Sequence, residues 1–452
     1  MSGPLSDRIP LVVPAGFHQV LDLLESGEES VFLTGKAGTG KSTLLQLYRR
    51  TTRRRMVILA PTGMAALQVG GQTVHSFFGF PPRFLAAQDI RRRRQLQWIS
   101  QLETIVIDEV SMLRADVMDA VDVSLRLHRE DPRPFGGVQM VFVGDLFQLP
   151  PVVAGPEEKY LFQSVYDSPY FFSARAYRRL HPVMHELRTV FRQESRHFLR
   201  LLDAVRTNTA DADDLEALNE RYQQVPAVAA DSDGPESQDI VLCSINAKAD
   251  RINQERLAAL PGQPQVYPAK VEGDFDPRLF PTDGKLVLKE GAQVMFVRND
   301  PDGQFVNGTL GVVRQIGPDE IWVRTAEGAL PGSIDIRVGP ATWEILRYRA
   351  VDERAEGSSR DGTLRIETEV VGSFVQYPLR LAWAITIHKS QGKTFDRMVI
   401  DLDRGAFAHG QVYVALSRCR TLEGIRLLQP LRPSDIRTDE KVVDFYDQES
   451  RR

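Results

Sequence analysis

The sequence is short of the features that mark secreted, metal-bound or membrane-inserted proteins. Only two cysteines, Cys243 and Cys419, occur in 452 residues, too few for a disulfide scaffold or a zinc module and consistent with a reducing compartment. No apolar run approaches the length of a membrane span. Residues 1–16 contain Arg8 but neither the apolar core of a signal peptide nor an arginine-rich amphipathic pattern. We therefore expect a cytoplasmic protein with no membrane contact.

An excess of positive charge is also missing. The 56 Lys and Arg against 60 Asp and Glu give a formal net charge of −4. Any contact with nucleic acid must therefore use a local groove rather than a global basic field. A hydrophobic content of 42% with 26% charged residues describes an ordinary globular protein. Because 452 residues are too many for one core, we expect two to four domains.

What the chain does contain is a glycine-rich stretch between a strand pattern and a helix pattern. Residues 30–42 read SVFLTGKAGTGKS, which matches the phosphate-binding pattern G-x-x-x-x-G-K-[ST] in its proper context. Glycines let main-chain amides approach phosphates, the lysine reaches the β- and γ-phosphates, and the serine hydroxyl binds Mg²⁺. The nucleotide-binding residues predicted here are Gly38, Thr39, Gly40, Lys41, Ser42 and Thr43.

Two later strand patterns end in side chains that suit phosphate chemistry. Residues 104–107 form an apolar run that ends in Asp108 and Glu109; the first is placed to hold Mg²⁺ and the second to orient and deprotonate a water molecule. Residues 138–143 form another run, followed by a loop with Gln148, whose amide can contact a γ-phosphate. Strands that alternate with helices up to residue 150 predict an α/β domain with a parallel sheet covered on both faces.

The loop after the strand at residues 56–60 is rich in hydroxyl groups and aromatic rings. Thr62, His75, Ser76 and Phe77 lie at or near the carboxyl end of that strand, where α/β sheets bind ligands. Small polar groups there can donate to phosphates, and rings can stack on bases. The alternative is that Phe77 and Phe78 pack into the core. The run of arginines at residues 91–94 is typical of a solvated face, although its position beside this loop favours a binding role modestly.

The rest of the chain predicts a second parallel sheet that is interrupted by short strands. An α/β pattern starts at residue 240, where Asn246 is placed to cap a helix. It resumes at residues 381–387, before a donor-rich loop that reads HKSQGKT. Between residues 284 and 365, short strands and turn signals predict a small antiparallel barrel. His181 and His185 have a spacing that could suit a metal, but no further Cys or His cluster supports one, so structural roles are expected.

Several long motifs, taken in order, resemble one family. The chain is similar to the Pif-type DNA helicases of superfamily one along nearly its whole length. The motifs that carry the resemblance are GKAGTGKS, APTGMAALQVGGQTVHSFFGF, IDEVSML, GGVQMVFVGDLFQLPPV, LRTVFRQ, ITIHKSQGKTFD and YVALSRCR. The segment PAGFHQ before the phosphate-binding loop departs from the usual leucine-rich form. The resemblance implies that Gln19 binds the edge of the adenine base. The alternative is that Gln19 is a surface residue on a short helix.

The resemblance implies a fold and a set of domains. It implies two RecA-like P-loop domains of α/β class with a small inserted SH3-like barrel. The expected boundaries are 1–185 for the first domain with a short wedge insertion near 80–100, 186–283 and 366–452 for the second, and 284–365 for the barrel.

The resemblance also implies a mechanism and partners. ATP and Mg²⁺ would lie between the two domains, with Arg192 and Arg418 as arginine fingers. Members move 5′→3′ on single-stranded DNA, unwind tailed or forked duplexes, and often act on G-quadruplexes and RNA–DNA hybrids; a monomer is expected. The residues that would line the DNA are Thr62, Gly63, His75, Ser76, Phe77, Asn307, Thr386, His388, Ser390 and Gln391.

Two other classes of protein stay open at this point. A RecD-type helicase shares a similar TxHKSQG loop and the ALSR helix, but the stretches GGQTVHSFFGF and GDLFQLPP favour the Pif type. The alternative from a different class is a P-loop ATPase that binds nucleic acid without moving along it. Such a switch has no need of two arginine fingers and a second DNA-lining domain, so Arg192 and Arg418 favour the helicase.

Overall fold

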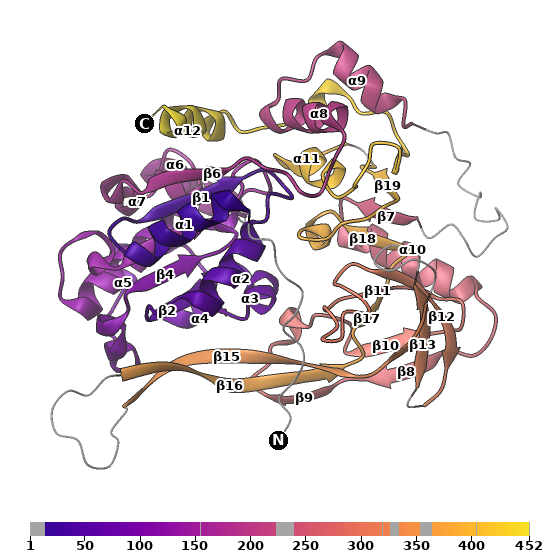
Figure 1. The fold of residues 1–452 in the computed structure, drawn as a ribbon, viewed down its shortest axis with the longest axis horizontal. Coiled ribbons are helices and arrows are strands. Elements are labelled where there is room, and N and C mark those ends of the chain that lie inside the picture. Colours follow the sequence, from indigo (N-terminus) through magenta and orange to yellow (C-terminus); the bar gives the residue numbers. More distant parts are fainter. Residues whose placement is uncertain are drawn as a thin grey trace. The chain divides into compact units, whose positions relative to one another are not determined.

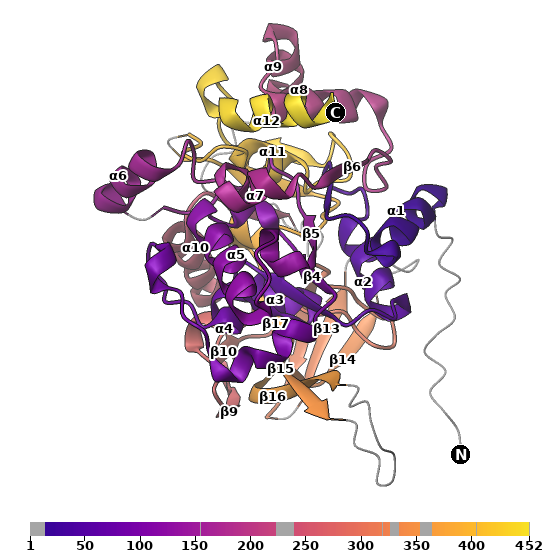
Figure 2. The same cartoon turned by 90° about the vertical axis from the view of Figure 1, so that its left-hand side faces the viewer.

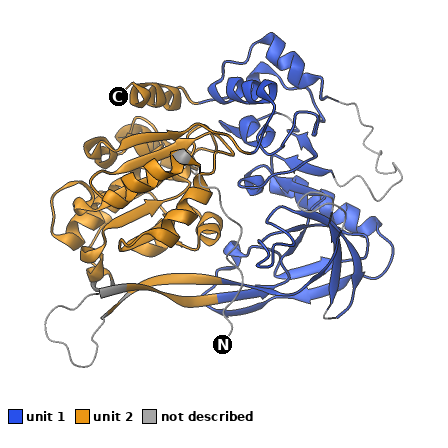
Figure 3. Ribbon diagram, viewed as in Figure 1, with its two compact units in different colours: residues 1–11, 192–343, 373–438 blue, residues 12–191, 344–372, 439–452 orange. Residues whose placement is uncertain are grey.

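The structure is a computed structural model that describes residues 14–153, 155–222, 239–318, 320–325, 334–352, 364–403 and 405–451. These residues fall into two compact units (Figure 3). Unit 1 takes its described residues from 192–343 and 373–438. Unit 2 takes them from 12–191, 344–372 and 439–452. Each unit contains its own parallel sheet, which confirms the predicted α/β class.

Unit 2 is built on a six-stranded sheet in which every pair of neighbours is parallel. Its strand order is β3-β2-β4-β5-β1-β6, and Figure 1 labels four of these strands, β2, β4, β1 and β6. The near-continuous apolar runs of the central strands are buried along their length, as expected for a parallel sheet covered on both faces. The strands are β1 (Val31–Gly35), β2 (Met56–Ala60), β3 (Gln72–Thr73), β4 (Thr104–Ile107), β5 (Gln139–Val143) and β6 (Val183–Leu187).

Helices cover both faces of this sheet (Figure 2). Alternate residues of a strand point to opposite faces, and the two faces of β1 show this directly. Val31 and Leu33 share a core with α1 (Ala15–Ser26) and α2 (Lys41–Thr51). Phe32 instead meets Phe171, with ring centroids 5.6 Å apart. The other helical segments of unit 2 are α3 (Gly63–Val69), α4 (Val74–Phe78), η1 (Ala87–Asp89), η2 (Arg94–Gln101), η3 (Val110–Met112), α5 (Ala115–Arg129), η4 (Pro134–Gly137), α6 (Gly155–Val165), η5 (Phe171–Ser173), α7 (Arg175–Leu180) and α12 (Glu440–Ser450).

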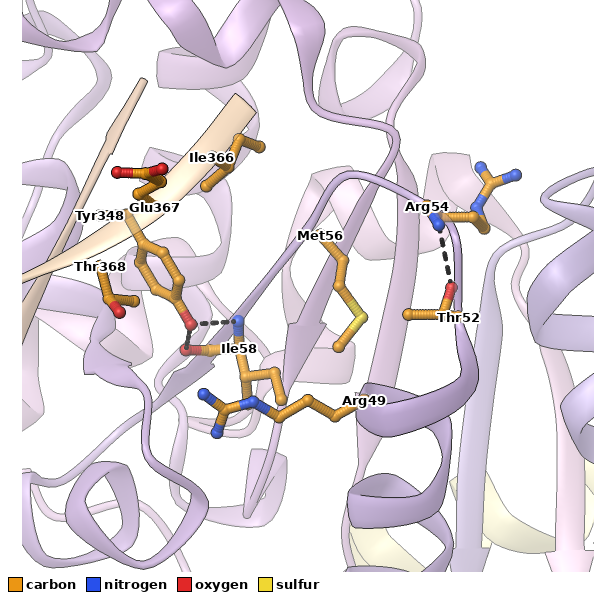
Figure 4. Close-up of a pocket in the computed structure, with 9 residues that line it drawn as sticks. All are labelled: Arg49, Thr52, Arg54, Met56, Ile58, Tyr348, Ile366, Glu367 and Thr368. Carbon is orange, nitrogen blue, oxygen red and sulfur yellow. Dashed lines mark hydrogen bonds between the residues drawn. The ribbon is translucent and has the colours of Figure 1, made fainter. Parts of the chain in front are cut away.

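Two segments from late in the chain complete unit 2. The last helix, α12, packs its Phe445 ring on Phe172 with centroids 4.3 Å apart. Part of the strand β15 (Ala341–Asp352) brings Tyr348 to β2, where the tyrosine hydroxyl accepts a hydrogen bond from the Ile58 amide at 3.1 Å (Figure 4). The short strand β3 pairs only with Leu59 and Ala60, so Tyr348 supplies a partner for β2 beyond the end of β3.

Unit 1 contains a four-stranded parallel sheet in the order β18-β7-β19-β20. Its strands are β7 (Ile240–Cys243), β18 (Ala384–Thr386), β19 (Met398–Asp401) and β20 (Ile425–Leu427). Asn253 of α10 (Asn246–Ala259) ties this helix to β18, since its side-chain amide donates to the Ala384 carbonyl at 2.8 Å. The other helical segments are α8 (Arg196–Thr207), α9 (Ala212–Asn219), η7 (Pro277–Leu279), η8 (His388–Ser390), α11 (Gln411–Leu416) and η9 (Pro433–Asp435).

Unit 1 also holds a five-stranded antiparallel sheet in the order β14-β13-β12-β11-β17. Its core includes Val294, Val313 and Val323 and extends to Leu286 of a separate two-stranded pair, β10-β8. The strands are β8 (Gln265–Pro268), β10 (Lys285–Leu288), β11 (Gln293–Phe296), β12 (Leu310–Ile316), β13 (Ile321–Thr325), β14 (Asp335–Val338) and β17 (Leu379–Leu381). A separate three-stranded sheet has the order β15-β16-β9, with β16 at Leu364–Gln376 and β9 at Lys270–Gly273.

The structure differs from the sequence prediction in a few places. Asn246 is the first residue of α10 rather than its cap; Ile245 holds the cap position, without a side-chain hydrogen bond. Long strands at β15 and β16 were not predicted. From their sequences, residues 225–238 are expected to form a polar loop and residues 352–362 a hairpin tip; all of the first segment, and all of the second except Asp352, lie outside the described residues. Within the described part of the chain, no helix combines the length and apolar character needed to cross a bilayer.

Candidate functional site

The glycine-rich loop of unit 2 connects β1 directly to α2. Gly38 and Gly40 have φ angles of 81° and 84°, a region that glycine adopts without the steric cost that a Cβ brings. A Cβ on Gly40 would also lie 2.9 Å from the Phe17 ring. The Lys41 ammonium folds over the loop and donates to the carbonyls of Gly35 at 2.6 Å and Lys36 at 3.0 Å. The loop therefore has the curled main chain and the central cation of a phosphate cradle.

The remaining predicted residues of the loop lie at the start of α2. Thr39 is buried, and its hydroxyl donates to the Lys36 carbonyl at 2.9 Å. Ser42 and Thr43 are exposed in the first turn of α2. The N-terminus of a helix attracts anions through its free amides and its dipole. The first turn of α2 can therefore hold a phosphate, with the hydroxyls of Ser42 and Thr43 within the same turn.

The two carboxylates that follow β4 occupy different environments. Asp108 is 7% exposed, and burial is the main cause that raises its pKa; the adjacent Glu109 carboxylate raises it further, while the Lys41 ammonium opposes the shift. Glu109 is partly exposed and has a left-handed main chain with φ 50° and ψ 42°. A non-glycine residue in this conformation is uncommon and is often found where a side chain is aimed at a site.

Gln148 lies in the loop after β5. Its side-chain amide donates to the Asp145 carboxylate at 3.3 Å, and it is 8% exposed. The strand order places β5 between β4 and β1, so the carboxyl ends of three neighbouring parallel strands carry the phosphate loop, the two carboxylates and Gln148. Ligands of α/β sheets bind at this edge. The structure thus gathers the predicted nucleotide-binding side chains of the first domain at one edge of the sheet.

The donor set at this edge fits a magnesium ion only if a nucleotide supplies further oxygens. The described residues hold no group of three or more His, Cys, Asp or Glu side chains that could bind a metal by themselves. Ser42 and Asp108 offer one hydroxyl and one carboxylate. Mg²⁺ is commonly held by one or two protein oxygens together with substrate phosphates and water, so the residues present fit that type of site.

Aromatic rings stand beside the phosphate loop. Phe17 of α1 meets Phe191 edge to face, with ring centroids 6.5 Å apart. The Phe191 amide donates to the Gly38 carbonyl at 2.9 Å, although its side chain is 54% exposed. Gln19 lies two residues after Phe17 on the exposed side of α1. The start of α1 is therefore beside the loop, as an adenine-reading role for Gln19 would require.

The two candidate finger arginines lie together in unit 1. Arg418 follows α11 and is 2% exposed; its Nε donates to the Val414 carbonyl at 2.9 Å, and Nη2 donates to the Ser417 hydroxyl at 2.8 Å. Arg192 donates to the Ser417 carbonyl at 3.1 Å. Burial lowers the pKa of Arg192, and Arg420 contributes to that shift while Tyr413 opposes it. Two arginines that are 226 positions apart in the sequence thus bond the same residue, Arg192 at the carbonyl of Ser417 and Arg418 at its hydroxyl.

The first candidate DNA segment shows a mixture of exposed and buried side chains. Thr62 caps α3 by accepting a hydrogen bond from the Ala65 amide at 3.3 Å, and Gly63 begins this helix. Ser76 is exposed, and burial lowers the pKa of the neighbouring His75. Phe77 is only 5% exposed. Its ring packs against Phe78, Trp98 and Tyr348, which is the core arrangement that the sequence left open.

The second candidate DNA segment follows β18 in unit 1. Thr386 accepts from the Lys389 amide at 3.3 Å, and the fully buried Ser390 donates to the Ile387 carbonyl at 2.7 Å. Burial lowers the pKa of His388, which leaves a neutral ring at pH 7. The Gln391 amide nitrogen is buried and has no hydrogen-bond partner among the described residues. A buried donor without a partner is costly, so a bound group that accepts from Gln391 would stabilise this loop.

Lys393 is a residue of this segment that the sequence did not single out. Its ammonium donates to the Asn307 side-chain oxygen at 2.6 Å, which brings Asn307 to the same loop although it lies 86 positions away. Burial and the nearby Arg380 lower the pKa of Lys393 to about 8. The sequence signal was present, because Lys393 belongs to the donor-rich stretch HKSQGKT. Only the fold shows that it contacts Asn307.

Comparisons with known proteins show which family the chain is similar to. A family model described as PIF1-like helicase matches residues 16–215, and a second, described as the 2B domain of DNA helicase Pif1, matches residues 279–316. The ATP-dependent DNA helicase Pif1 of Bdellovibrio bacteriovorus is 34% identical over 440 residues, which cover 95% of this chain and 90% of that protein. The ATP-dependent DNA helicase PIF1 of Mus musculus is 36% identical over 449 residues, covering 94% of this chain and 61% of the mouse protein. The chain thus spans about three fifths of the mouse, rat and human relatives.

Solved structures show the same likeness. The Pif1 of a Bacteroides species in complex with ADP-AlF4 has a TM-score of 0.85 and 34% identity, and each chain is covered to 97%. Bacteroides Pif1 bound to single-stranded DNA has a TM-score of 0.66 with the same identity and the same coverage.

Proposed function

Because this chain belongs to the Pif1-like helicase family, we propose that it is an ATP-dependent DNA helicase that moves 5′→3′ on single-stranded DNA and unwinds duplexes. One observation carries the proposal: the phosphate loop, two carboxylates and Gln148 meet at one edge of a parallel sheet, and the chain also holds the buried Arg418, with the partly buried Arg192 bonded to the carbonyl of the residue before it. A protein that only binds nucleic acid needs neither set.

The residues of unit 2 would bind and activate the triphosphate. The glycine-rich loop and Lys41 would hold the phosphates through main-chain amides and one ammonium group. Ser42 and Asp108 would hold Mg²⁺, which when bound neutralises charge on the phosphates. Glu109 would orient and deprotonate the attacking water, and Gln148 would contact the γ-phosphate. Gln19 would read the adenine edge, with Gly38, Thr39, Gly40 and Thr43 completing the nucleotide site.

Arg192 and Arg418 of unit 1 would act as arginine fingers. An arginine placed against the transferring phosphoryl group stabilises the charge that spreads over its oxygens, and such a group contributes about 10³- to 10⁵-fold to turnover. Both arginines belong to a different unit from the phosphate loop. Their engagement would therefore depend on closure of the two units on the nucleotide, and this closure would couple hydrolysis to movement on DNA.

The nucleic-acid path would use loops from both units. Thr62, Gly63, His75 and Ser76 would line one part. Phe77, which is only 5% exposed, would offer little surface to the DNA. His388 and Gln391 would line the other part together with Asn307, whereas the predicted residues Thr386 and Ser390 are 4% and 0% exposed and would instead hold the shape of this loop through their hydrogen bonds. Single-stranded DNA and tailed or forked duplexes are the proposed partners, with G-quadruplexes and RNA–DNA hybrids as further substrates, and the proposed active form is a monomer.

The domain assignment belongs to the same proposal. We assign residues 1–185 to a first RecA-like domain that includes a wedge segment near 80–100. Residues 186–283 and 366–452 would form the second RecA-like domain. Strands β11 to β14 of the five-stranded antiparallel sheet fall within 284–365 and support a small SH3-like barrel there, while the fifth strand, β17, lies outside these bounds at Leu379–Leu381.

Strand displacement on tailed duplexes tests the proposal directly. The protein, ATP and Mg²⁺ are mixed with duplexes that carry either a 5′ or a 3′ single-stranded tail, and release of the labelled strand is measured over time. Fast release from the 5′-tailed duplex alone is expected, and Lys41→Ala should show none. Release from the 3′-tailed duplex alone would overturn the polarity. DNA-stimulated ATP hydrolysis without release from either substrate would favour a non-translocating ATPase.

A further inference from the structure

A buried glutamine holds the main chain on both sides of Arg418. Gln193 is 3% exposed, and its side-chain nitrogen donates to the Ser417 carbonyl at 3.1 Å and to the Cys419 carbonyl at 2.9 Å. These two residues flank Arg418 in the sequence. All of these groups lie in unit 1. The two N–H groups of one amide thus fix the peptide groups immediately before and after the arginine.

The position of these carbonyls explains why they need a partner. The helix α11 ends at Leu416, so the carbonyls of Ser417 and Cys419 follow the helix and receive no donor from its hydrogen-bond pattern. Both flanking residues are fully buried, so water cannot replace the missing donors. The Arg418 carbonyl between them accepts from the Phe395 amide at 2.9 Å. Three successive carbonyls are therefore bonded, and Gln193 supplies the donors for two of them.

We propose that Gln193 is a positioning residue for ATP hydrolysis, which holds the turn after α11 so that Arg418 is presented with a fixed main chain. This inference rests on the proposed function, in which Arg418 is an arginine finger. Gln193 itself touches no phosphate in this role. It acts through the peptide groups of Ser417 and Cys419. Arg192, its sequence neighbour, donates to the same Ser417 carbonyl. Two consecutive residues, one of them a candidate finger itself, therefore contact the main chain next to Arg418.

The chemistry of the side chain suits this task. A glutamine amide carries two N–H donors on one planar group and no charge, so it can serve two carbonyls without placing a further cation beside Arg192 and Arg418. Methionine has nearly the same shape and no donor. A displacement of a catalytic group by about 1 Å can lower turnover about a hundredfold, so a loosened turn is expected to reduce kcat strongly even when the fold is intact.

The experiment measures DNA-stimulated ATP hydrolysis by the full chain with Gln193→Met. We expect kcat to fall about tenfold or more. The affinity for a fluorescent ADP analogue should change less than about threefold, because the phosphate loop belongs to unit 2. Gln193→Asn keeps the amide on a shorter chain and should fall between wild type and Gln193→Met. If Gln193→Met does not fold, the Asn variant decides, and a wild-type kcat there would overturn the proposal.

Gln376→Met is the matched control. Gln376 is also 3% exposed, and its side-chain nitrogen also donates to two main-chain carbonyls, those of Tyr267 at 2.8 Å and Asp283 at 3.2 Å. It lies in unit 1 but on β16, away from α11. A kcat near wild type is expected for this variant. An equal loss of kcat in Gln376→Met and Gln193→Met would show a general effect of losing a buried amide and would overturn the positioning role.

A double variant separates this inference from the proposed function. In an Arg418→Ala background, Gln193→Met should lower kcat by less than about twofold further, because residues that act through one another are not additive. A full further loss would overturn the proposal. If Arg418→Ala lowers kcat and Gln193→Met does not, only the positioning role fails. If Arg418→Ala leaves kcat unchanged, the finger assignment fails, and the positioning role fails with it.

Discussion

The two parallel sheets of this chain have similar architectures and different loops. In unit 2, the strands β1, β4 and β5 lead into a glycine-rich loop, two carboxylates and Gln148, which together suit a triphosphate. In unit 1, β18 leads into a donor-rich turn that is bonded to Asn307 through Lys393, and the helix α11 ends just before Arg418. The same layered scaffold thus presents an anion cradle in one unit and buried cations in the other. Under the proposed function, the chemistry would reside in the loops at the strand and helix ends and not in the sheets.

The first prediction removes the cation from the cradle of unit 2. Lys41→Ala should lower ATP hydrolysis by about 10³-fold or more, because the ammonium that reaches the β- and γ-phosphates is lost. Binding of a single-stranded oligonucleotide, measured by fluorescence anisotropy, should change little. Lys36→Ala is the control in the same loop and should keep most of the activity. Loss of hydrolysis and DNA binding together would indicate misfolding, and equal effects of both variants would contradict the special role of Lys41.

The second prediction removes the cation from the other unit. Arg418→Ala should lower DNA-stimulated turnover by about 10³-fold, the contribution expected of an arginine finger, while nucleotide affinity stays within a few-fold. Arg420→Ala is the control, because Arg420 is two residues away and its side chain is 54% exposed in an ion pair with Asp396 at 3.2 Å, an arrangement that contributes little to stability. A steady-state ATPase assay suffices. An unchanged rate in Arg418→Ala would remove the finger from the mechanism.

The sheet of unit 2 could be predicted from the sequence because its signals are local. The apolar run at Val31–Leu33, the glycines and Lys41 are contiguous, and the strands that end near Asp108 and Gly144 are also recognisable within a few residues. Their loops fall at one edge because parallel strands share an edge. Local patterns of this kind therefore predicted both the α/β class and the grouping of the candidate nucleotide residues.

The features that the sequence did not reveal depend on contacts between distant segments. Nothing near Tyr348 indicates that its hydroxyl pairs with Ile58, 290 positions away. Nothing near Gln193 indicates that it bonds the residues around Arg418. Phe77 illustrates a different limit, since an aromatic residue in a ligand-binding loop has the same local pattern whether its ring faces a base or packs on Trp98. In the structure, the Phe77 ring packs on Trp98 in the core of unit 2.

The third prediction compares lysines by their response to pH. Burial, with the nearby Arg380, lowers the pKa of Lys393 to about 8 in the folded protein, against about 10.4 in an unfolded chain. Between these values the unfolded chain binds more protons, so the free energy of unfolding rises with pH, by up to about 3 kcal/mol. Urea unfolding at pH 8 and pH 10 should show this rise in wild type and lack it in Lys393→Met.

The control for Lys393 is an exposed lysine of the same unit. Lys285→Met on β10 removes a lysine that is exposed to solvent, so its stability difference from wild type should be nearly the same at both pH values. If Lys393→Met also differs from wild type by one constant amount at pH 8 and pH 10, the ammonium keeps an ordinary pKa in the folded protein. The donor-rich turn of unit 1 would then be better hydrated than its burial implies.

The last prediction compares the effects of replacing two partly buried histidines, His388 in unit 1 and His185 in unit 2. His388→Ala should reduce DNA-stimulated ATP hydrolysis by about tenfold, since a contact between a base and a side-chain ring contributes about 1–3 kcal/mol, and should leave basal hydrolysis within about twofold. His185 on β6 is the control, because burial lowers its pKa in the same direction and no DNA contact is proposed for it. The ratio of stimulated to basal turnover is the measurement. If His388→Ala lowers both rates equally, or if His185→Ala lowers the ratio as much as His388→Ala does, the loop after β18 does not contact DNA through His388. The proposed difference in function between the loops of the two sheets would then be wrong for this loop.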